Sequence, residues 1–269
     1  MELSSLRSCR SVLYFPASNA RAIEKARQLP ADMVILDCED AVKPEDKDMA
    51  RQAALAALEE GFGNRVTAMR INAIGQVWHR DDLSAAARCK ADFIVLPKVE
   101  GAAAVRQVAG ASGKRIIAMI ETAAGVLAAA EIARASAGLI AGTNDLAADL
   151  GIPSSADRRG LAHGLQAIVL TARAAGAAAF DGVYNRLEDD DGLAAECREG
   201  RAFGFDGKTL IHPRQVEIAN RCFSPSEDEV ETARRMLAAF GGGAERFEGR
   251  MIEAMHVAEA ELMLARARA

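Results

Sequence analysis

Short apolar segments recur eight times along this chain, and their spacing constrains the fold more than any other feature. Runs of this length that end in turn-forming or charged residues are typical of strands buried in a parallel sheet. The segments between them are rich in Ala, Leu and Glu, which favour helices. We predict strands, including the residues at their carboxyl ends, at 11–15, 33–36, 66–72, 92–98, 116–120, 138–144, 178–181 and 207–213.

The alternation of eight strands with helices predicts an α/β fold, a TIM (β/α)8 barrel, which typically takes about 250 residues. Gly241–Gly243 forms a flexible linker after the last barrel helix. We therefore expect a barrel catalytic domain over residues 1–240 and a C-terminal helical extension over residues 241–269. We predict helices at 20–29, 43–60, 123–135, 159–175, 189–203, 214–220, 227–240 and 250–266.

Composition narrows the classes of function. The net charge is −5 with no basic run, which argues against nucleic acid as a partner. The first residues lack the pattern of a signal peptide, and no apolar run reaches the ~18 residues of a membrane span. The five cysteines are scattered, without a C-x-x-C pair, so we expect free thiols in a reducing cytoplasm. Cys38 is expected to be buried filler rather than a nucleophile.

Two acidic residues follow neighbouring predicted strands. Glu121 comes directly after 116–120, and Asp145 follows 138–144. The carboxyl ends of parallel strands are where α/β folds bind ligands. Two carboxylates without nearby Cys or His favour a hard cation such as Mg²⁺. The alternative is that Glu121 caps the following helix and Asp145 begins another.

A second group of charges follows the second and third predicted strands. Asp37, Glu39 and Asp40 lie within four residues, a density that a cation or a cationic partner would explain. Arg70 ends an apolar run, so it must face acids or an anionic ligand. A structural ion pair between Arg70 and these acids is the alternative.

The helix after the first strand carries two cations on one face. Arg21 and Lys25 are four residues apart, and Ser18 or Asn19 can cap the helix. A helix N-terminus with two cations suits a phosphate, although a solvated basic face would have the same pattern. Lys98, at the end of the fourth strand, follows Pro97, and nothing near it in the sequence favours a Schiff base.

Seven motifs follow one another in order between Arg10 and Val216, and the resemblance they carry covers nearly the whole chain. They are RSVLYFPASNARAIEKA, VILDCEDAVKPEDK, MRINA, VLPKVE, IETAAGV, GTNDLAADLG and LIHPRQV. Together they resemble the citrate lyase beta-subunit family, which includes malyl-CoA lyases and related CoA-ester lyases and thioesterases. The resemblance implies a TIM barrel, Mg²⁺ and an acyl-CoA-linked hydroxy acid as the small-molecule partner. It also implies a homo-oligomer, most simply a trimer, in which a C-terminal acid reaches across a subunit interface.

The resemblance assigns roles residue by residue. It implies metal ligands at Glu121 and Asp145 and a substrate-binding Arg70. The chemistry of an enolate adds a catalytic role for Arg70, with Glu39 and Asp40 expected to orient it and metal-bound water. Asn144 joins Arg70, Glu121 and Asp145 in binding substrate. The expected CoA contacts are Tyr14, Asn19, Arg21, Lys25, Ile211 and His212.

One residue departs from the family pattern. The family's C-terminal base is the Asp of a G-x-[ML]-[IV]-D motif, which here reads Gly249 to Glu253. The longer Glu253 is the expected base. The apolar residues around it, which we expect to cover a neighbouring subunit, are Met251, Ile252, Met255, Leu262 and Leu264.

The expected function is Mg²⁺-dependent cleavage of a carbon–carbon bond in a malyl-CoA, citramalyl-CoA or citryl-CoA type of thioester, through an enolate. The first alternative is a thioesterase acting on malyl-CoA-type substrates, or a Mg²⁺-dependent pyruvate aldolase without CoA. The second alternative is a subunit of a larger lyase complex that has no activity alone. Which hydroxy acid is bound depends on pocket shape.

Overall fold

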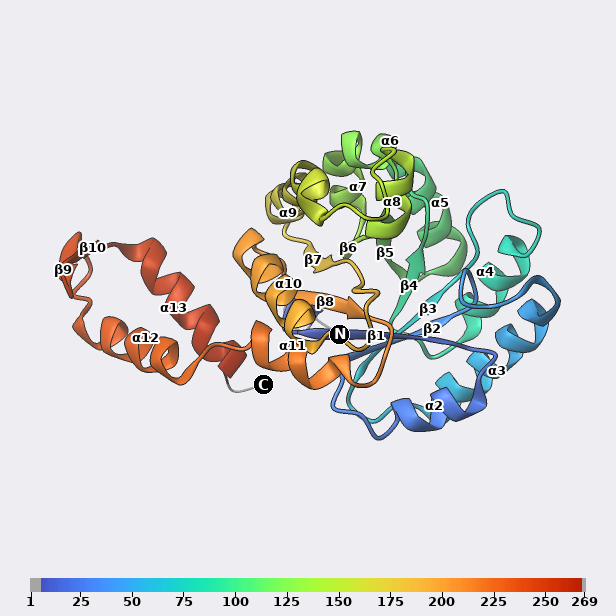
Figure 1. Cartoon of the computed structure of the whole chain (residues 1–269), viewed down its shortest axis with the longest axis horizontal. Coiled ribbons are helices and arrows are strands. Elements are labelled where there is room, and N and C mark those ends of the chain that lie inside the picture. The colour runs from blue at the N-terminus through green and yellow to red at the C-terminus, as the bar shows by residue number, and fades with distance from the viewer. Residues whose placement is uncertain (1–5, 268–269) are drawn as a thin grey trace. The chain divides into compact units, whose positions relative to one another are not determined.

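The computed structural model describes residues 6–267, apart from the side chains of residues 262, 265 and 266. Eight parallel strands pair in chain order, and the last pairs with the first to close a barrel. Helices surround it, as Figure 1 shows. The predicted TIM barrel is therefore confirmed. The strands are β1 (Ser11–Pro16), β2 (Met33–Asp37), β3 (Val66–Arg70), β4 (Phe93–Leu96), β5 (Arg115–Ile120), β6 (Gly138–Ala141), β7 (Ala178–Asp181) and β8 (Gly207–Leu210).

The helices of the barrel differ from the predicted ones mainly at their ends. Residues 43–60 begin with a 3₁₀ turn, η1, because Pro44 precedes the α-helix. Residues 123–135 form two helices, separated where Ala128 leaves the helical conformation. The elements are α2 (Ala20–Ala26), η1 (Pro44–Asp46), α3 (Lys47–Glu60), α4 (His79–Arg88), α5 (Ala102–Ser112), α6 (Ala123–Leu127), α7 (Ala129–Ala135), α8 (Thr143–Asp149), η2 (Arg158–Leu161), α9 (Ala162–Ala175), α10 (Asp190–Phe203) and α11 (Gln215–Phe223).

Alternate strand residues fill the interior of the barrel, as the two-residue period of a strand requires. Val12 and Tyr14 of β1 pack with Met119 of β5 and Phe180 of β7 in one buried cluster. Small residues such as Ala68 accompany the larger ones, so the interior is a packed core rather than a channel. Ligands must therefore bind at an end of the barrel.

The last part of the chain forms a second compact unit, which starts at Arg221. The boundary thus falls between Asn220 and Arg221 rather than at residue 240, and the second unit includes the helix at 227–240. That helix begins with a capping box between Ser226 and Glu229. The elements that follow α11 are α12 (Glu227–Ala239), β9 (Glu245–Phe247), β10 (Arg250–Ile252) and α13 (Ala254–Ala267).

The C-terminal unit corrects one predicted helix. We expected residues 250–266 to be helical throughout, but residues 245–252 form an antiparallel hairpin in which Arg250 pairs with Phe247. Glu248 and Gly249 make the turn with positive φ angles of 47° and 81°, which a continuous helix does not allow. Met251 and Met255 are exposed, Ile252 is buried, and the side chain of Leu262 lies outside the described residues.

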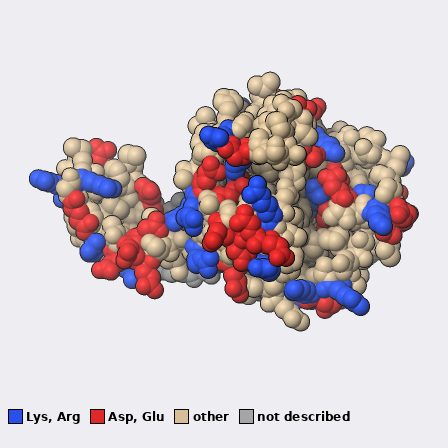
Figure 2. Space-filling view, in the orientation of Figure 1, with Lys and Arg blue, Asp and Glu red and all other residues tan. Residues whose placement is uncertain are grey.

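Two features bear on possible partners. Among residues 6–267, no helix is long and apolar enough to cross a membrane. Figure 2 shows acidic and basic side chains interspersed on the visible face of the barrel unit, without a large basic field of the kind that binds nucleic acid.

Candidate active site

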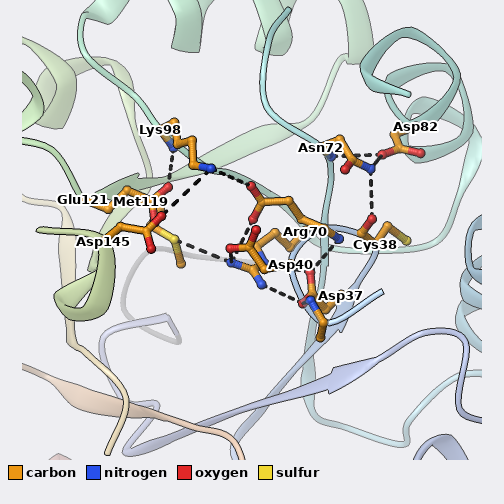
Figure 3. A network of polar contacts seen from close by, with 12 residues as sticks. Asp37, Cys38, Asp40, Arg70, Asn72, Asp82, Lys98, Met119, Glu121 and Asp145 are labelled. Atoms are coloured by element: carbon orange, nitrogen blue, oxygen red, sulfur yellow. Dashed lines mark hydrogen bonds and ion pairs between the residues drawn. The ribbon is translucent and has the colours of Figure 1, made fainter. Parts of the chain in front are cut away.

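Arg70, the last residue of β3, is held by three carboxylates (Figure 3). Its Nε and Nη2 donate to the two oxygens of Asp37 at 2.7 and 2.6 Å. Its Nη1 lies 2.9 Å from Glu39 Oε2 and 3.6 Å from Asp40 Oδ2. The guanidinium carbon also lies 5.0 Å from the ring centroid of Tyr14. The ion pair considered as the alternative for Arg70 is thus present.

Asp37 was predicted as one of three acids that could pair with Arg70, but not as a catalytic or binding residue, and it makes the shortest contacts with the guanidinium. It ends β2 and lies in register with Arg70 on the adjacent strand, so its carboxylate can meet the guanidinium with two parallel bonds. The same carboxylate accepts the backbone N–H groups of Glu39 and Ala41. The in-register position of Asp37 beside Arg70, at the ends of consecutive strands, is the signal that would have selected it among the three acids.

Glu121 lies directly after β5 and is buried. Its Oε1 accepts the backbone N–H of Lys98 at 2.6 Å, and Lys98 has a left-handed φ of 52°. Gly142, after β6, leaves room for this carboxylate, because a Cβ at residue 142 would lie 2.4 Å from Glu121 Cβ. Burial raises the pKa of Glu121 to about 7. A buried carboxylate of this kind needs a cationic or hydrogen-bonding partner when it is ionised.

Asp145 lies in the first turn of α8, so it does begin a helix, as the alternative reading held. Its side chain is 43% exposed, and its Oδ2 lies 4.0 Å from Lys98 Nζ, which also lies 3.8 Å from Glu39 Oε1. Burial lowers the pKa of Lys98, but the surrounding carboxylates, Glu39 foremost, outweigh it and raise the pKa above its usual value. A protonated ammonium is a poor nucleophile, which argues against a Schiff base.

Most of these groups, though not Glu39 and Lys98, line one cavity of about 350 Å³ at the carboxyl ends of the strands. It lies at the end of a barrel where enzymes of this architecture place their active sites. Asn144, whose side-chain amide pairs with that of Asn185, also lines it. The cavity residues that carry charge or come from the predicted site are Tyr14, Asp37, Asp40, Arg70, Glu121, Asn144, Asp145 and Ile211.

The donors at this cavity fit magnesium. The hydrogen bond that the Glu121 carboxylate accepts from the described residues, from the Lys98 N–H, goes to Oε1, which leaves Oε2 for a ligand. Asp145 offers carboxylate oxygens on the same cavity. Within residues 6–267 no three His, Cys, Asp or Glu side chains gather as a metal cluster. Mg²⁺ commonly takes one or two carboxylates and completes its shell with water and substrate, so two ligands suffice.

The predicted CoA contacts fall into two groups. Ile211 and His212 follow β8, and their backbone N–H groups both donate to Gln215 Oε1, at 3.0 and 3.2 Å. Asn19 caps α2, since its Oδ1 accepts the N–H of Ala22 at 3.1 Å. The two cations of that helix, Arg21 and Lys25, are exposed and do not line the cavity.

Two further predicted residues have defined surroundings. Tyr14 is buried in the barrel interior, with its ring against Arg70, and it forms part of the cavity lining. Glu253 follows β10 in the C-terminal unit, where its backbone N–H donates to His256 Nδ1 at 3.0 Å. Its side chain is exposed. Its role as the base stays a prediction, as do the CoA contacts.

A second group of buried charges involves Asp181, at the end of β7. Its carboxylate pairs with Lys208 Nζ at 3.0 Å and with Arg158 at 2.9 Å. Burial raises the pKa of Asp181, but Lys208 and Arg158 outweigh it, and the pKa falls below its usual value. Asp181 is therefore committed to these partners. The cysteines are free thiols, as predicted, and burial raises the pKa of Cys38 far above its usual value, so it is not a nucleophile.

The closed parallel barrel and the charged cavity at its carboxyl end define an α/β-barrel protein with an enzyme-like site. The chain belongs to the HpcH/HpaI aldolase/citrate lyase family, whose sequence model matches residues 10–213. The family predicted from the motifs is therefore confirmed.

Similar proteins extend over nearly the whole chain. A (3S)-malyl-CoA thioesterase of Cereibacter sphaeroides is 47% identical over 270 residues, which cover 97% of this chain and 95% of that protein. The citrate lyase subunit beta of Escherichia coli is 33% identical over 285 residues, covering 97% and 94%. Among solved structures, CitE from Mycobacterium tuberculosis in complex with magnesium, acetoacetate and coenzyme A has 37% identity and a TM-score of 0.85, covering 98% of this chain and 100% of that one.

Proposed function

We propose that this chain is a Mg²⁺-dependent enzyme that cleaves a carbon–carbon bond in the CoA thioester of a small hydroxy acid of the malyl-CoA type. The observation that carries the proposal is the cavity where Arg70, at the end of β3, lies with Glu121, directly after β5, and Asp145, in the first turn of α8. Support comes from CitE, whose structure contains magnesium, a keto acid and coenzyme A. The relative from C. sphaeroides, named for malyl-CoA, supports the substrate class.

The chemistry assigned to the side chains follows from where charge develops. Magnesium held by Glu121 and Asp145 would supply a Lewis acid for the hydroxy-acid oxygens. When the bond between the hydroxyl carbon and the thioester α-carbon breaks, its electron pair passes to the α-carbon and the thioester oxygen as an enolate. Arg70 neutralises that oxygen, and the carboxylates around it fix the direction of its remaining N–H groups. Glu253 takes the hydroxyl proton and then returns it to the α-carbon of the enolate, which gives the methyl group of the product thioester.

The second candidate is hydrolysis of the same thioester. It is favoured by the 47% identity to a (3S)-malyl-CoA thioesterase over nearly the full length. Hydrolysis also develops negative charge on the thioester oxygen, so Arg70 has the same role in both reactions. The longer Glu253, in place of the family's Asp, could direct a water molecule to the carbonyl instead of accepting the hydroxyl proton.

Product analysis separates the candidates. The purified chain is incubated with malyl-CoA and Mg²⁺, and the products are followed by chromatography and by titration of free thiol. Cleavage gives acetyl-CoA and glyoxylate without free thiol, whereas hydrolysis gives malate and free CoA. Turnover of a hydroxy-keto acid without CoA would instead support the aldolase. No turnover of either substrate class by the chain alone would support the subunit of a larger complex, as the beta-subunit relatives suggest.

The metal assignment has its own test. We expect Glu121→Gln and Asp145→Asn to abolish Mg²⁺-dependent turnover, because each removes a charged ligand while preserving the shape of the side chain. Thermal unfolding shows whether the variants remain folded, and Mg²⁺ titration of kcat shows whether the metal is lost. Near wild-type turnover of either variant at low Mg²⁺ would contradict the assignment.

A further inference from the structure

A buried lysine lies outside the cavity, behind the loop of residues 38–40, which we call the acidic loop. Lys47 is the first residue of α3, and it is only 5% exposed. Its ammonium donates to the backbone oxygen of Cys38 at 2.9 Å, to that of Glu39 at 2.7 Å and to Asn72 Oδ1 at 2.8 Å. All three of its N–H groups are thus used. The ring of Trp78 lies 5.1 Å from the same nitrogen.

These three acceptors join the two chain segments that hold Arg70. Cys38 and Glu39 follow β2, and Asn72 follows β3 two residues after the arginine. Asn72 Nδ2 donates to the Cys38 backbone oxygen at 2.9 Å and to Asp82 Oδ2 at 2.5 Å (Figure 3). Asp82 of α4 is anchored in turn by Arg51 at 2.7 Å. The loop backbone is therefore fixed from behind by a continuous set of buried polar contacts.

Burying an ammonium is a weak way to add stability, because desolvation offsets much of what the contacts contribute. Its more specific effect is geometric. The backbone of residues 38–40 determines where the carboxylates of Glu39 and Asp40 stand around the guanidinium. None of Lys47, Asn72 and Asp82 lines the cavity, so they act on substrate only through residues 38–40 and the end of β3.

We propose that Lys47 is a positioning residue, which holds the Cys38–Asp40 backbone against the end of β3 and thereby sets the carboxylates that orient Arg70 for reaction. The proposal rests on the proposed function, because orientation of Arg70 matters only if it faces a developing oxyanion. A misplacement of about 1 Å in such a group can cost about a hundredfold in rate.

The chain contains a matched control at the opposite end of the barrel. Lys114 precedes β5, and its Nζ donates to the backbone oxygens of Cys89 and Ala91 at 2.7 and 2.8 Å. Lys114→Met removes the same kind of lysine-to-loop contact, far along the strands from the cavity. Comparing it with Lys47→Met separates the effect of losing a lysine from the effect of loosening the acidic loop.

The test measures kcat, KM and amide hydrogen exchange in both variants. For Lys47→Met we expect kcat to fall about tenfold to a hundredfold, while KM changes by less than about threefold. Exchange should rise about tenfold in residues 38–42 but not in residues 89–92. For Lys114→Met we expect the reverse exchange pattern and a kcat within about twofold of wild type. An equal loss of kcat in both variants would overturn the proposal, as would loosening of the loop without loss of kcat.

Two additional variants sharpen the result. In a Glu39→Gln background, Lys47→Met should reduce kcat less than it does in the wild type, because both changes act on one element. Fully additive effects would overturn the proposal.

Lys47→Arg keeps the positive charge, and it replaces Lys47→Met in the test if that variant does not fold. Its planar donors cannot match three acceptors, so kcat should fall at least about threefold. A wild-type kcat in this variant would contradict the three-point contact.

The failure of the proposal and the failure of the proposed function are distinguishable. If the wild type turns over no CoA thioester, the proposed function fails, but hydrogen exchange still reports whether Lys47 orders the loop. If the wild type is active and the loop loosens in Lys47→Met without a change in kcat, only the positioning role fails.

Discussion

At the scale of single residues, Arg70 determines how the site can work. Its Nε and Nη2 bind Asp37, which leaves Nη1 as the group shared between Glu39, Asp40 and the cavity. The structural ion pair and the ligand-facing role, which the sequence left as alternatives, are therefore compatible. One edge of the guanidinium binds Asp37, and Nη1 on the other side lies near Glu39, Asp40 and Met119.

Arg70→Lys tests this division. Lysine keeps the charge but cannot bind both oxygens of Asp37 and still point a donor toward Glu39 and the cavity. We expect kcat/KM to fall more than about tenfold, which corresponds to more than about 1.4 kcal/mol. Steady-state kinetics at saturating Mg²⁺ measure the loss. Unchanged kinetics would mean that the arginine serves only its ion pair with Asp37.

Glu39 makes the stability of the protein depend on pH. Burial raises its pKa to about 8, against the opposing effect of Arg70, so below that pH the folded state holds a proton that the unfolded state releases, and the neutral Glu39 side chain contacts Arg70 as a hydrogen-bonding group rather than as an ion. Between about pH 4.5 and 8 the folded state binds more protons, and stability therefore falls as pH rises, by up to about 1.4 kcal/mol per pH unit. Glu39→Gln should make this dependence shallower at every pH between about 4.5 and 8, and what remains below about pH 7 comes from Glu121, whose pKa is also raised.

Urea unfolding at several pH values measures the effect, with Asp48→Asn, an exposed surface acid paired with Arg51, as the control. The control should retain the wild-type slope. A Glu39→Gln variant whose stability depends on pH as steeply as that of the wild type would show that Glu39 has an ordinary pKa.

At the scale of elements, the close approach of β5 and the start of α8 shapes the proposed metal site. Gly142 lies between them, and a side chain there would meet Glu121 Cβ at 2.4 Å and Oε2 at 2.7 Å. Lys98 adds a second constraint, since only its left-handed backbone directs its N–H to Glu121. The carboxylate is therefore held by backbone geometry from two neighbouring strands.

Gly142→Ala tests the close approach. We expect a loss of stability of about 1 to 3 kcal/mol, typical of overpacking, and at least a tenfold rise in the Mg²⁺ concentration needed for half-maximal activity. Thermal unfolding and Mg²⁺ titration measure the two effects. Gly110→Ala is the matched control, because a Cβ there meets nothing within 4 Å and alanine favours the helix α5. If both variants behave alike, Gly142 is not a constraint on the site.

The same elements show how much could be predicted. The strands and the acids that follow them were predictable, because a buried strand has a short apolar signature and its carboxyl end is the binding end. The pairing of Asp37 with Arg70 could also have been predicted, because both residues end consecutive parallel strands. The approach of Gly142 to Glu121 and the left-handed Lys98 were not, since both depend on distances across strands. The hairpin before Glu253 was missed because its few residues carry no strand pattern.

At the scale of the whole molecule, the main expectation concerns assembly. Glu253 is exposed in a unit that is compact by itself, and the family resemblance implies that it acts in a neighbouring subunit of a trimer. Mixing inactive Glu121→Gln chains with inactive Glu253→Ala chains should then restore activity. In an equal mixture about a quarter of the sites combine an intact barrel with an intact Glu253.

Activity after subunit exchange, followed with light scattering to establish the oligomer, measures the recovery. Mixed oligomers without any recovery would place Glu253 within its own chain or outside the reaction. A monomer in solution would contradict the shared site directly.

The closure of the barrel has a consequence for biosynthesis. Val12 of β1 pairs with Thr209 of β8, so one edge of the first strand lacks its partner until 197 further residues have been made. At about 5 to 20 residues per second, the ribosome needs roughly 10 to 40 s for that distance. During this time the nascent chain carries an open apolar sheet edge, which is prone to aggregation. We therefore expect the yield in cells to depend on translation speed and chaperone supply more than on the stability of the finished barrel.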